Sequence, residues 1–369
     1  MWDAINATKR PVLLILSSFM LLGACQKKEY HNEPLVVFQE TNKIKDFYNS
    51  IKEIKIVSLE NDDHFLGSRC DLIYDKGDYF IVDVPNNHLY RYDTNGHFAC
   101  EYGRFGRGPG EFRNILNIQI IDDTVVIYSV PEMTALHYDR DGNYLRTETQ
   151  KINGVQFYIV DNGILAFHGY GTSNCKVSLL TEGRQKDFYP YTFQVASFID
   201  QGPIFTNNGK YVFVRDPYER TIYQYVDGQV KPRLSIDFGT YAISDSFFSL
   251  EYIESAEYMM EQDICFISRY CESSDYRLLE VKRPQNSSTY YGVSFNDKWI
   301  WFNAGTKKSC LFADGIKDLV DDTLICLVEA PRLRQMDKEL FAKIVNPEAL
   351  SEIEKVENDV IMMVRLREW

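Results

Sequence analysis

The stretch Leu89-Tyr90-Arg91-Tyr92-Asp93-Thr94-Asn95-Gly96 returns, with changes, as Leu136-His137-Tyr138-Asp139-Arg140-Asp141-Gly142. Each copy is an alternating, strand-like run that ends in a turn glycine and follows an apolar run, at 79–85 and 125–131. A third copy spans 211–228, and a degenerate copy ends at Gly183. The Asn-Gly and Asp-Gly pairs indicate tight hairpins, because such turns need a positive φ.

The spacing of these turns predicts the architecture. Gly96, Gly142, Gly183 and Gly228 follow one another at intervals of 46, 41 and 45 residues. Four antiparallel strands in about 40–45 residues make one blade of a β-propeller, whereas a β-sandwich has no such period. We therefore predict an all-β chain: a six-bladed β-propeller of four-stranded antiparallel blades, with a helical insertion and short C-terminal helices.

The helical segments are the exceptions to the repeat. Residues 245–262 are acidic and loosely helical in spacing, which predicts a helical or irregular insertion in the fifth blade. Residues 331–344 and 347–357 predict two short helices, and 359–366 predicts a final strand. A chain that ends on a strand suits a ring whose last blade closes against the first.

A glycine-rich segment lies between the first two copies. It reads Tyr-Gly-Arg-Phe-Gly-Arg-Gly-Pro-Gly-Glu-Phe over 102–112. Glycine frees φ and proline fixes it, so no helix or strand is expected to run through this mixture. It lacks the Gly-Lys-Ser/Thr ending of a P-loop. We expect a shaped loop that crosses from one sheet to the next, built by Gly103, Gly106, Gly108, Pro109, Gly110 and Glu111.

Two residue pairs are candidate binding groups. Arg104 and Arg107 could clamp an anion with forked donors, helped by glycine N–H groups. The alternative, which we favour, is that they pair with Glu111 or with a neighbouring blade's aspartate and fix the crossing. Trp299 and Trp301 alternate along a strand, so both face one side, where they could stack on a sugar or, as we favour, pack between blades.

The first 24 residues are typical of a targeting segment. Lys9 and Arg10 precede an apolar run at 12–22, which is short for a membrane span. Leu-Gly-Ala-Cys at 22–25 resembles a bacterial lipoprotein box, which implies cleavage before Cys25 and acyl chains, such as palmitate, on that cysteine. The alternative is an ordinary secretory signal with an incidental cysteine. The predicted organisation is a signal peptide at 1–24, a lipidated tether at 25–34 and the propeller at 35–369.

Composition excludes some classes of function. The net charge of −13 argues against a nucleic-acid partner, and 45% apolar with 14% aromatic residues argues against disorder.

Seven cysteines besides Cys25 cannot all pair within the chain, and no C-x-x-C occurs. We expect no metal site and no cofactor, because no two of the histidines stand at ligand spacing: His31, His64, His88, His97, His137 and His168.

Catalysis is not indicated but stays open. The aspartates Asp83, Asp93, Asp122, Asp123, Asp139 and Asp141 could pair as in a glycosidase, although turn capping explains them better. A Ser-His-Asp triad can be assembled from distant residues, and no G-x-S-x-G elbow is present.

With these residues in place, the chain resembles the six-bladed β-propeller lipoproteins of the Bacteroidetes, relatives of the NHL-repeat propellers. The likeness rests on the Gly-Arg-Gly-Pro-Gly-Glu-Phe loop at 106–112, the flanking repeats and the closing strand, where Asp359 replaces the usual proline. It implies an outer-membrane lipoprotein held at the membrane by lipid, with the periplasmic or surface face left open.

The function expected from these observations is binding. The propeller would engage a glycan, a peptide or an envelope protein with loops near its central channel. The alternative is an enzyme, a lyase or hydrolase acting on an envelope or dietary polymer. Convergent His, Asp or Glu side chains in the channel mouth would favour the enzyme, and aromatic residues with scattered polar groups would favour the binder.

Overall fold

The computed structural model describes residues 33–41, 44–60, 66–67, 70–149, 154–169, 173–190, 202–305, 311–312, 315–353 and 359–369. These residues belong to one unit, Glu33–Trp369. The predicted signal peptide, Cys25 and nearly all of the tether lie outside the described residues, as do His31, His64 and Cys310.

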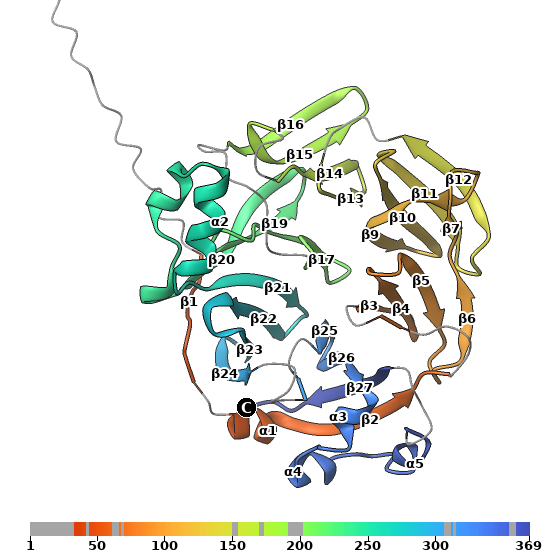
Figure 1. Cartoon of the computed structure of the whole chain (residues 1–369), viewed down its shortest axis with the longest axis vertical. Coiled ribbons are helices and arrows are strands. Elements are labelled where there is room, and N and C mark those ends of the chain that lie inside the picture. The colour runs from red at the N-terminus through yellow and green to blue at the C-terminus, as the bar shows by residue number, and fades with distance from the viewer. Residues whose placement is uncertain are drawn as a thin grey trace, which may run out of the picture. The chain divides into compact units, whose positions relative to one another are not determined.

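Six antiparallel sheets form the blades of a six-bladed β-propeller, as predicted (Figure 1). Each blade has four strands in sequence order from the channel outward, except the last, whose outer strand comes from the N-terminal part. Blade 1 is β3 (Cys70–Asp75), β4 (Asp78–Asp83), β5 (His88–Tyr92) and β6 (Phe98–Glu101); blade 2 is β9 (Asn114–Ile121), β10 (Thr124–Val130), β11 (Thr134–Asp139) and β12 (Tyr144–Thr149); blade 3 is β13 (Gln156–Val160), β14 (Gly163–Phe167), β15 (Cys175–Thr181) and β16 (Arg184–Pro190); blade 4 is β17 (Phe205–Asn207), β18 (Val212–Arg215), β19 (Thr221–Val226) and β20 (Gln229–Asp237); blade 5 is β21 (Phe266–Glu272), β22 (Tyr276–Arg283), β23 (Ser288–Phe295) and β24 (Lys298–Gly305); blade 6 is β25 (Ile316–Val320), β26 (Thr323–Glu329), β27 (Asp359–Leu366) and β2 (Ile51–Ser58).

The four turn glycines occupy equivalent positions, in the hairpin between the third and fourth strands of blades 1 to 4. Their φ values lie between +71° and +86°, which explains why the turns need glycine. In blade 1 the Asp93 carboxylate accepts the backbone N–H groups of residues 95 and 97, and Asp139 does the same for residues 141 and 143 in blade 2. The prediction that these aspartates cap turns is confirmed.

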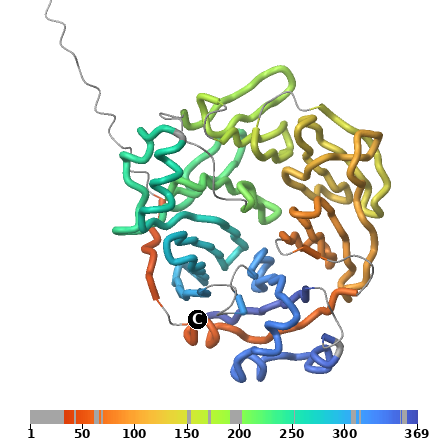
Figure 2. The backbone as a smooth tube through the Cα atoms, in the orientation of Figure 1, coloured from red at the N-terminus to blue at the C-terminus, as the bar shows by residue number. Residues whose placement is uncertain are grey.

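Closure of the ring joins the two ends of the described chain. β2 pairs antiparallel with β27, from Ile51 opposite Leu366 to Ser58 opposite Val360. The strands lie side by side in Figure 2, one near the red end of the colour bar and one at the blue end. Ile51, Ile54 and Val364 are fully buried there. The expectation that a final strand closes the ring is confirmed, with β2 as its partner.

Two N-terminal elements extend this arrangement. β1 (Leu35–Val37) adds a fifth strand to blade 4 and runs parallel to β20. α1 (Ile44–Ser50) covers β24, and its Phe47 stacks on Phe302 with ring centroids 4.1 Å apart. The short apolar run at 35–38 by itself predicts a strand, but neither its place in blade 4 nor the helix after it is predicted from sequence.

The predicted insertion lies elsewhere than expected. η1 (Gly239–Tyr241), η2 (Asp245–Ser249) and α2 (Tyr252–Glu261) connect blade 4 to blade 5 and precede the first strand of blade 5, so they are not inside that blade. The reason is hydrophobic: Phe247 and Met259 bury against Tyr218, which lies between β18 and β19 of blade 4, and against Phe266, which begins β21 of blade 5.

The C-terminal helices are shorter than predicted. α3 (Ala330–Leu333), α4 (Lys338–Phe341) and α5 (Ala349–Ile353) lie between β26 and β27, while η3 (Pro284–Asn286) joins β22 to β23. The predicted helix over 331–344 is split because the Asp337 carboxylate accepts the N–H of Glu339 and starts a new helix.

The core lies between the faces of neighbouring blades. Blade 6 meets blade 1 through Ile325, Ile361, Leu72, Tyr79 and Ile81, all almost fully buried. Comparable clusters lie at the other blade contacts. Because each sheet is covered on both faces, its strands are apolar over several successive residues, as in Val-Val-Ile-Tyr at 125–128.

Candidate functional site

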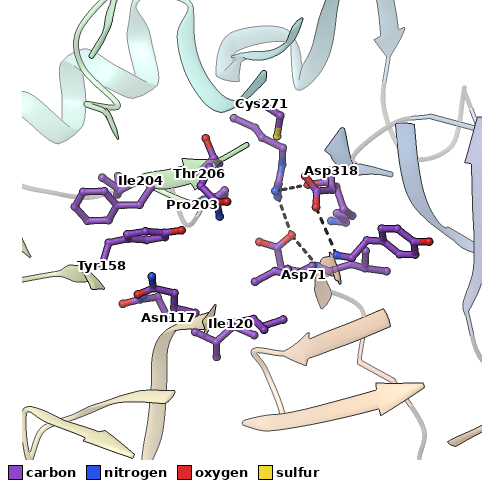
Figure 3. Close-up of a pocket in the computed structure, with 18 of the residues that line it drawn as sticks. Asp71, Asn117, Ile120, Tyr158, Pro203, Ile204, Thr206, Cys271 and Asp318 are labelled. Carbon is purple, nitrogen blue, oxygen red and sulfur yellow. Dashed lines mark hydrogen bonds and ion pairs between the residues drawn. The ribbon is translucent and has the colours of Figure 1, made fainter. Parts of the chain in front are cut away.

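The first strands of the six blades line a central cavity of about 760 Å³ (Figure 3). Its walls come from β3, β9, β13, β17, β21 and β25. Small-molecule sites typically measure about 300–1,000 Å³ and lie where several elements converge. This cavity is therefore the candidate site.

Side chains from one blade hold the strand edges of the next. An innermost strand has one edge without a neighbouring strand, and its backbone groups need other partners. Asn117 donates to the Phe157 carbonyl at 2.8 Å and accepts the Phe157 N–H at 3.1 Å; Gln119 repeats this with Ile159. Gln156 makes the same pair of bonds with the connection before β17. These side-chain amides bond to the backbone of the next blade, so the wall of the cavity is fixed before any ligand binds.

The wall formed by blades 1, 5 and 6 is charged. Arg269 of β21 is 8% exposed, and its guanidinium donates to Asp71 Oδ1 at 2.8 Å and to the Lys317 carbonyl at 2.6 Å. Its Nε lies 3.8 Å from Glu280 Oε2. Burial acts to lower the pKa of Arg269, but Asp71 and Glu280 outweigh it and raise that pKa. The three groups form a bridge between blades 5 and 1.

The pKa values of two carboxyl groups on this wall, those of Asp71 and Asp318, are shifted in opposite directions. Burial acts to raise the pKa of Asp71, but Arg269 and then Lys317 hold it below its usual value. Burial raises the pKa of Asp318 to about 6, although it accepts the N–H groups of Leu319 at 2.8 Å and Tyr74 at 3.5 Å. One cavity thus holds an ionised carboxylate and one that titrates near neutral pH.

The facing wall is aromatic and uncharged. Figure 3 shows Tyr158, Ile204, Thr206 and Asn117 across the cavity from Asp71 and Asp318. The rings of Tyr158 and Phe205 lie 5.8 Å apart at 41°. The cavity therefore presents a polar wall and an apolar wall to one occupant.

We expect Asp318→Asn to change how stability depends on pH. The folded pKa of about 6 lies above the unfolded value of about 3.9, so the native state favours the protonated acid and stability falls as pH rises from about 4 through 6. Asparagine keeps an acceptor oxygen and has no charge to bury. The variant should be close to the parent in stability at pH 4 and exceed it by about 3 kcal/mol at pH 7.5 in urea unfolding. An equal difference at both pH values would contradict the assignment.

The glycine-rich segment crosses from blade 1 to blade 2, as predicted. It contains one departure from the predicted loop, a two-residue parallel pair of β7 (Arg104–Phe105) and β8 (Glu111–Phe112). The Glu111 carboxylate accepts the N–H groups of Arg107 at 3.0 Å and Gly108 at 2.8 Å, and Arg104 Nε donates to it at 2.8 Å. The Gly108 N–H, then Arg104, lower the pKa of Glu111. The loop's anion site is thus filled by the chain's own glutamate, in line with the structural alternative for Arg104.

Gly106 leaves room for that carboxylate. A Cβ at residue 106 would collide with Glu111 Oε2. We therefore expect Gly106→Ala to destabilise the protein by about 1–3 kcal/mol and lower its Tm by several degrees, because overpacking forces neighbours to shift. Thermal unfolding followed by circular dichroism measures the change. In a Glu111→Ala background the same substitution should cost clearly less; an undiminished cost would show that the collision is not the cause.

The tryptophans lie between blades. Trp301 is 3% exposed, in a cluster that spans blades 4 and 5, and its ring meets Phe38 edge-on at 5.3 Å. Trp299 stacks on Trp301 at 5.9 Å and packs against the same cluster. Neither residue lines the cavity. Their position agrees with packing between blades, the alternative that the sequence favours.

Among the described residues, a histidine, a serine and an aspartate of blade 3 lie in hydrogen-bonding contact, with the histidine and the serine buried. His168 Nε2 lies 2.7 Å from Ser178 Oγ, and Ser178 donates to Asp187 at 2.6 Å. In a catalytic triad the carboxylate orients the histidine, whereas here it binds the serine, which is 0% exposed. Across the described ranges no cluster of histidine, cysteine and carboxylate side chains has metal-binding geometry.

The charged wall was missed from sequence. Arg269 and Asp71 are 198 residues apart, and no local motif connects them. One signal was available: Lys317 and Asp318 interrupt an otherwise apolar run of five residues, Ile-Lys-Asp-Leu-Val. Adjacent charges within so short a strand indicate a position that does not face a blade.

Comparisons with known proteins agree with the fold. A Bacteroides fragilis protein described as a candidate exported protein has a solved structure that covers 90% of this chain and all of its own, with a TM-score of 0.72 and 16% identity. A DUF4221 family member from Bacteroides vulgatus covers 86% of this chain and 98% of its own, with a TM-score of 0.52 and 11% identity. At these identities the likeness concerns the fold alone.

No curated protein matches the chain. No helix among the described residues has the length and apolar character of a membrane span. A family model described as "Domain of unknown function (DUF4934)" matches residues 36–365, which is nearly the whole propeller, and the chain therefore belongs to that family.

Proposed function

We propose that this protein is an exported envelope protein, anchored by lipid on Cys25 in the outer membrane, whose propeller binds a glycan or a peptide in its central cavity. The observation that carries the proposal is the two-sided cavity of about 760 Å³, with Arg269, Asp71 and Asp318 on one wall and Tyr158 on the other. Aromatic rings suit the apolar faces of a sugar or a side chain, and polar groups fix orientation. Because the wall of the cavity is already rigid, no flexible segment has to become ordered around a ligand, which favours a binding role.

A screen of purified protein against glycans and peptides tests the binding proposal. The Tyr158→Ala variant should lose at least tenfold in affinity for the ligand that the screen finds. Phe105→Ala is the matched control, because Phe105 is 73% exposed on the crossing loop and lies outside the cavity. Equal affinity in all three proteins would place the ligand elsewhere, and a screen without a ligand would argue for a scaffold role through protein contacts.

Lipid anchoring is tested separately. Cys25→Ser should abolish incorporation of labelled palmitate and release the protein from the membrane fraction. The similar B. fragilis protein is described as a candidate for export, which supports the proposed destination. Retention of the serine variant in the membrane fraction would contradict the proposed anchor.

A second candidate is a hydrolase or lyase. The observation that favours it is the pair Asp71 and Asp318, whose pKa values are shifted in opposite directions within one cavity, as in acid and base partners of many enzymes. Polymer cleavage that Asp318→Asn and Asp71→Asn each remove would support this role. Binding of an intact polymer without release of products would support the binding role.

A further inference from the structure

The side chain of Lys317 has an unusual position on the charged wall. The register between β25 and β26 shifts between Ile316 and Asp318, so Lys317 has no opposite residue in the ladder. Such irregularities re-aim a side chain next to functional sites. Lys317 lines the cavity, and its carbonyl is held by Arg269 at 2.6 Å. The strand is thus fixed from its backbone, while the ammonium group is left for another partner.

Asp71 and Glu280, the two acids whose charges act on Lys317, are already engaged with other groups. Asp71 binds Arg269, and Glu280 accepts the hydroxyl of Ser268 at 2.7 Å with Lys282 Nζ at 3.5 Å. Within the described part of the chain, the Lys317 ammonium makes no hydrogen bond and no ion pair within 4.0 Å. Burial lowers the pKa of Lys317, while Asp71 acts in the opposite direction. A ligand anion in the cavity would supply the direct ion pair that this ammonium lacks.

We infer that the ligand of the central cavity carries a carboxylate and that the Lys317 ammonium binds it. Lys317 offers one positive charge, since the guanidinium of Arg269 is held by Asp71, Glu280 and a carbonyl. A carboxylate monoanion meets less repulsion from Asp71 and Asp318 than a phosphate dianion would. The body of the ligand would then lie toward Tyr158 on the facing wall.

This inference rests on the proposed binding function and narrows its ligand class. Two sources supply such a group, a uronic-acid sugar and the free carboxyl end of a peptide. The probes are therefore two matched pairs: digalacturonate with neutral galactobiose, and an N-acetyl dipeptide acid with its amide. Isothermal titration at pH 7 with purified protein should show at least tenfold tighter binding of one acid than of its neutral partner, and the pair that responds identifies the source.

Variants assign the effect to Lys317. Lys317→Met should remove the preference for the acid, so that the acid and its neutral partner bind with equal affinity, while Lys317→Arg should keep the preference. Methionine suits a buried site, so the variant is expected to fold; cooperative thermal unfolding checks this. Lys282→Met is the matched control, because Lys282 lies beside the same Glu280 but does not line the cavity.

The outcomes separate this inference from the proposed function. Equal affinity for acid and neutral partner, or an acid preference that survives in Lys317→Met, overturns the carboxylate inference and leaves a binding role standing. Failure of all four probes overturns the inference for both sources, and failure of the wider glycan and peptide screen is what counts against the binding role itself.

Discussion

A chain that begins at Glu60, without β2, is expected to lose its cooperative fold. β2 supplies the outer strand of blade 6, and its Ile51, Ile54 and Ile56 are 0–2% exposed. Burial of each such side chain contributes about 1.5–3 kcal/mol, so the three together approach the 5–15 kcal/mol that stabilises a typical protein. Removal also exposes the edge of β27 to other chains. Circular dichroism and thermal unfolding should show a broad, weak transition and aggregation.

The matched control begins at Ile44. It keeps α1 and β2 but lacks β1, the fifth strand of blade 4, and the Phe38 that follows it; Val36 and Phe38 bury in the cluster between blades 4 and 5. This chain should unfold cooperatively at a moderately lower Tm. A synthetic peptide covering residues 44–60, added in trans, should restore part of the signal to the Glu60 chain. A sharp transition of the Glu60 chain within about 5 °C of the parent would contradict the closure argument.

The second large effect is expected from Arg269→Met. Loss of the guanidinium leaves Asp71 and Glu280 without their shared counter-charge and frees the Lys317 carbonyl. Removal of one partner from a buried ionic group typically costs about 3–5 kcal/mol, because an uncompensated charge remains. Urea unfolding at pH 7 measures the loss.

A second substitution tests the cause. In the double variant Arg269→Met with Asp71→Asn, one of the two stranded charges is gone, and part of the stability should return. Lys76→Met is the control for a generic loss of charge: its ammonium lies 3.1 Å from Asp123, and both side chains are more than half exposed. It should cost less than about 1 kcal/mol. Equal costs for the two single variants would contradict the importance of burial.

The fold was readable because its signals are local. A glycine at residue 96 or 142 fits a hairpin with positive φ whatever the rest of the chain does, and its return at a steady interval implies repeated sheets. β25 gave no comparable signal, because it has five residues and carries two charges. β1 was visible as a strand, but its neighbour β20 lies about 200 residues away. Pairing at that distance has no trace in either segment.

The site could be predicted less well from the sequence, because the residues that form it are far apart in the chain. The cavity exists only where six strands from distant parts of the sequence converge, and Asp71 or Tyr158 alone resembles an ordinary strand residue. The segments that attracted functional hypotheses have structural partners instead: Arg104 binds Glu111, and Trp301 packs against Phe38. In this chain the most conspicuous local sequence motifs form tight turns and contacts between blades.

The pairing of β2 with β27 also sets an order of events during synthesis. The first of these strands ends at Ser58 and the second begins at Asp359, so about 300 residues must be made between them. At roughly 5–20 residues per second, the early strand waits about 15–60 s for its partner. Throughout that time its apolar side chains are without their partner strand, and a holding chaperone that covered this segment would protect it until β27 is made.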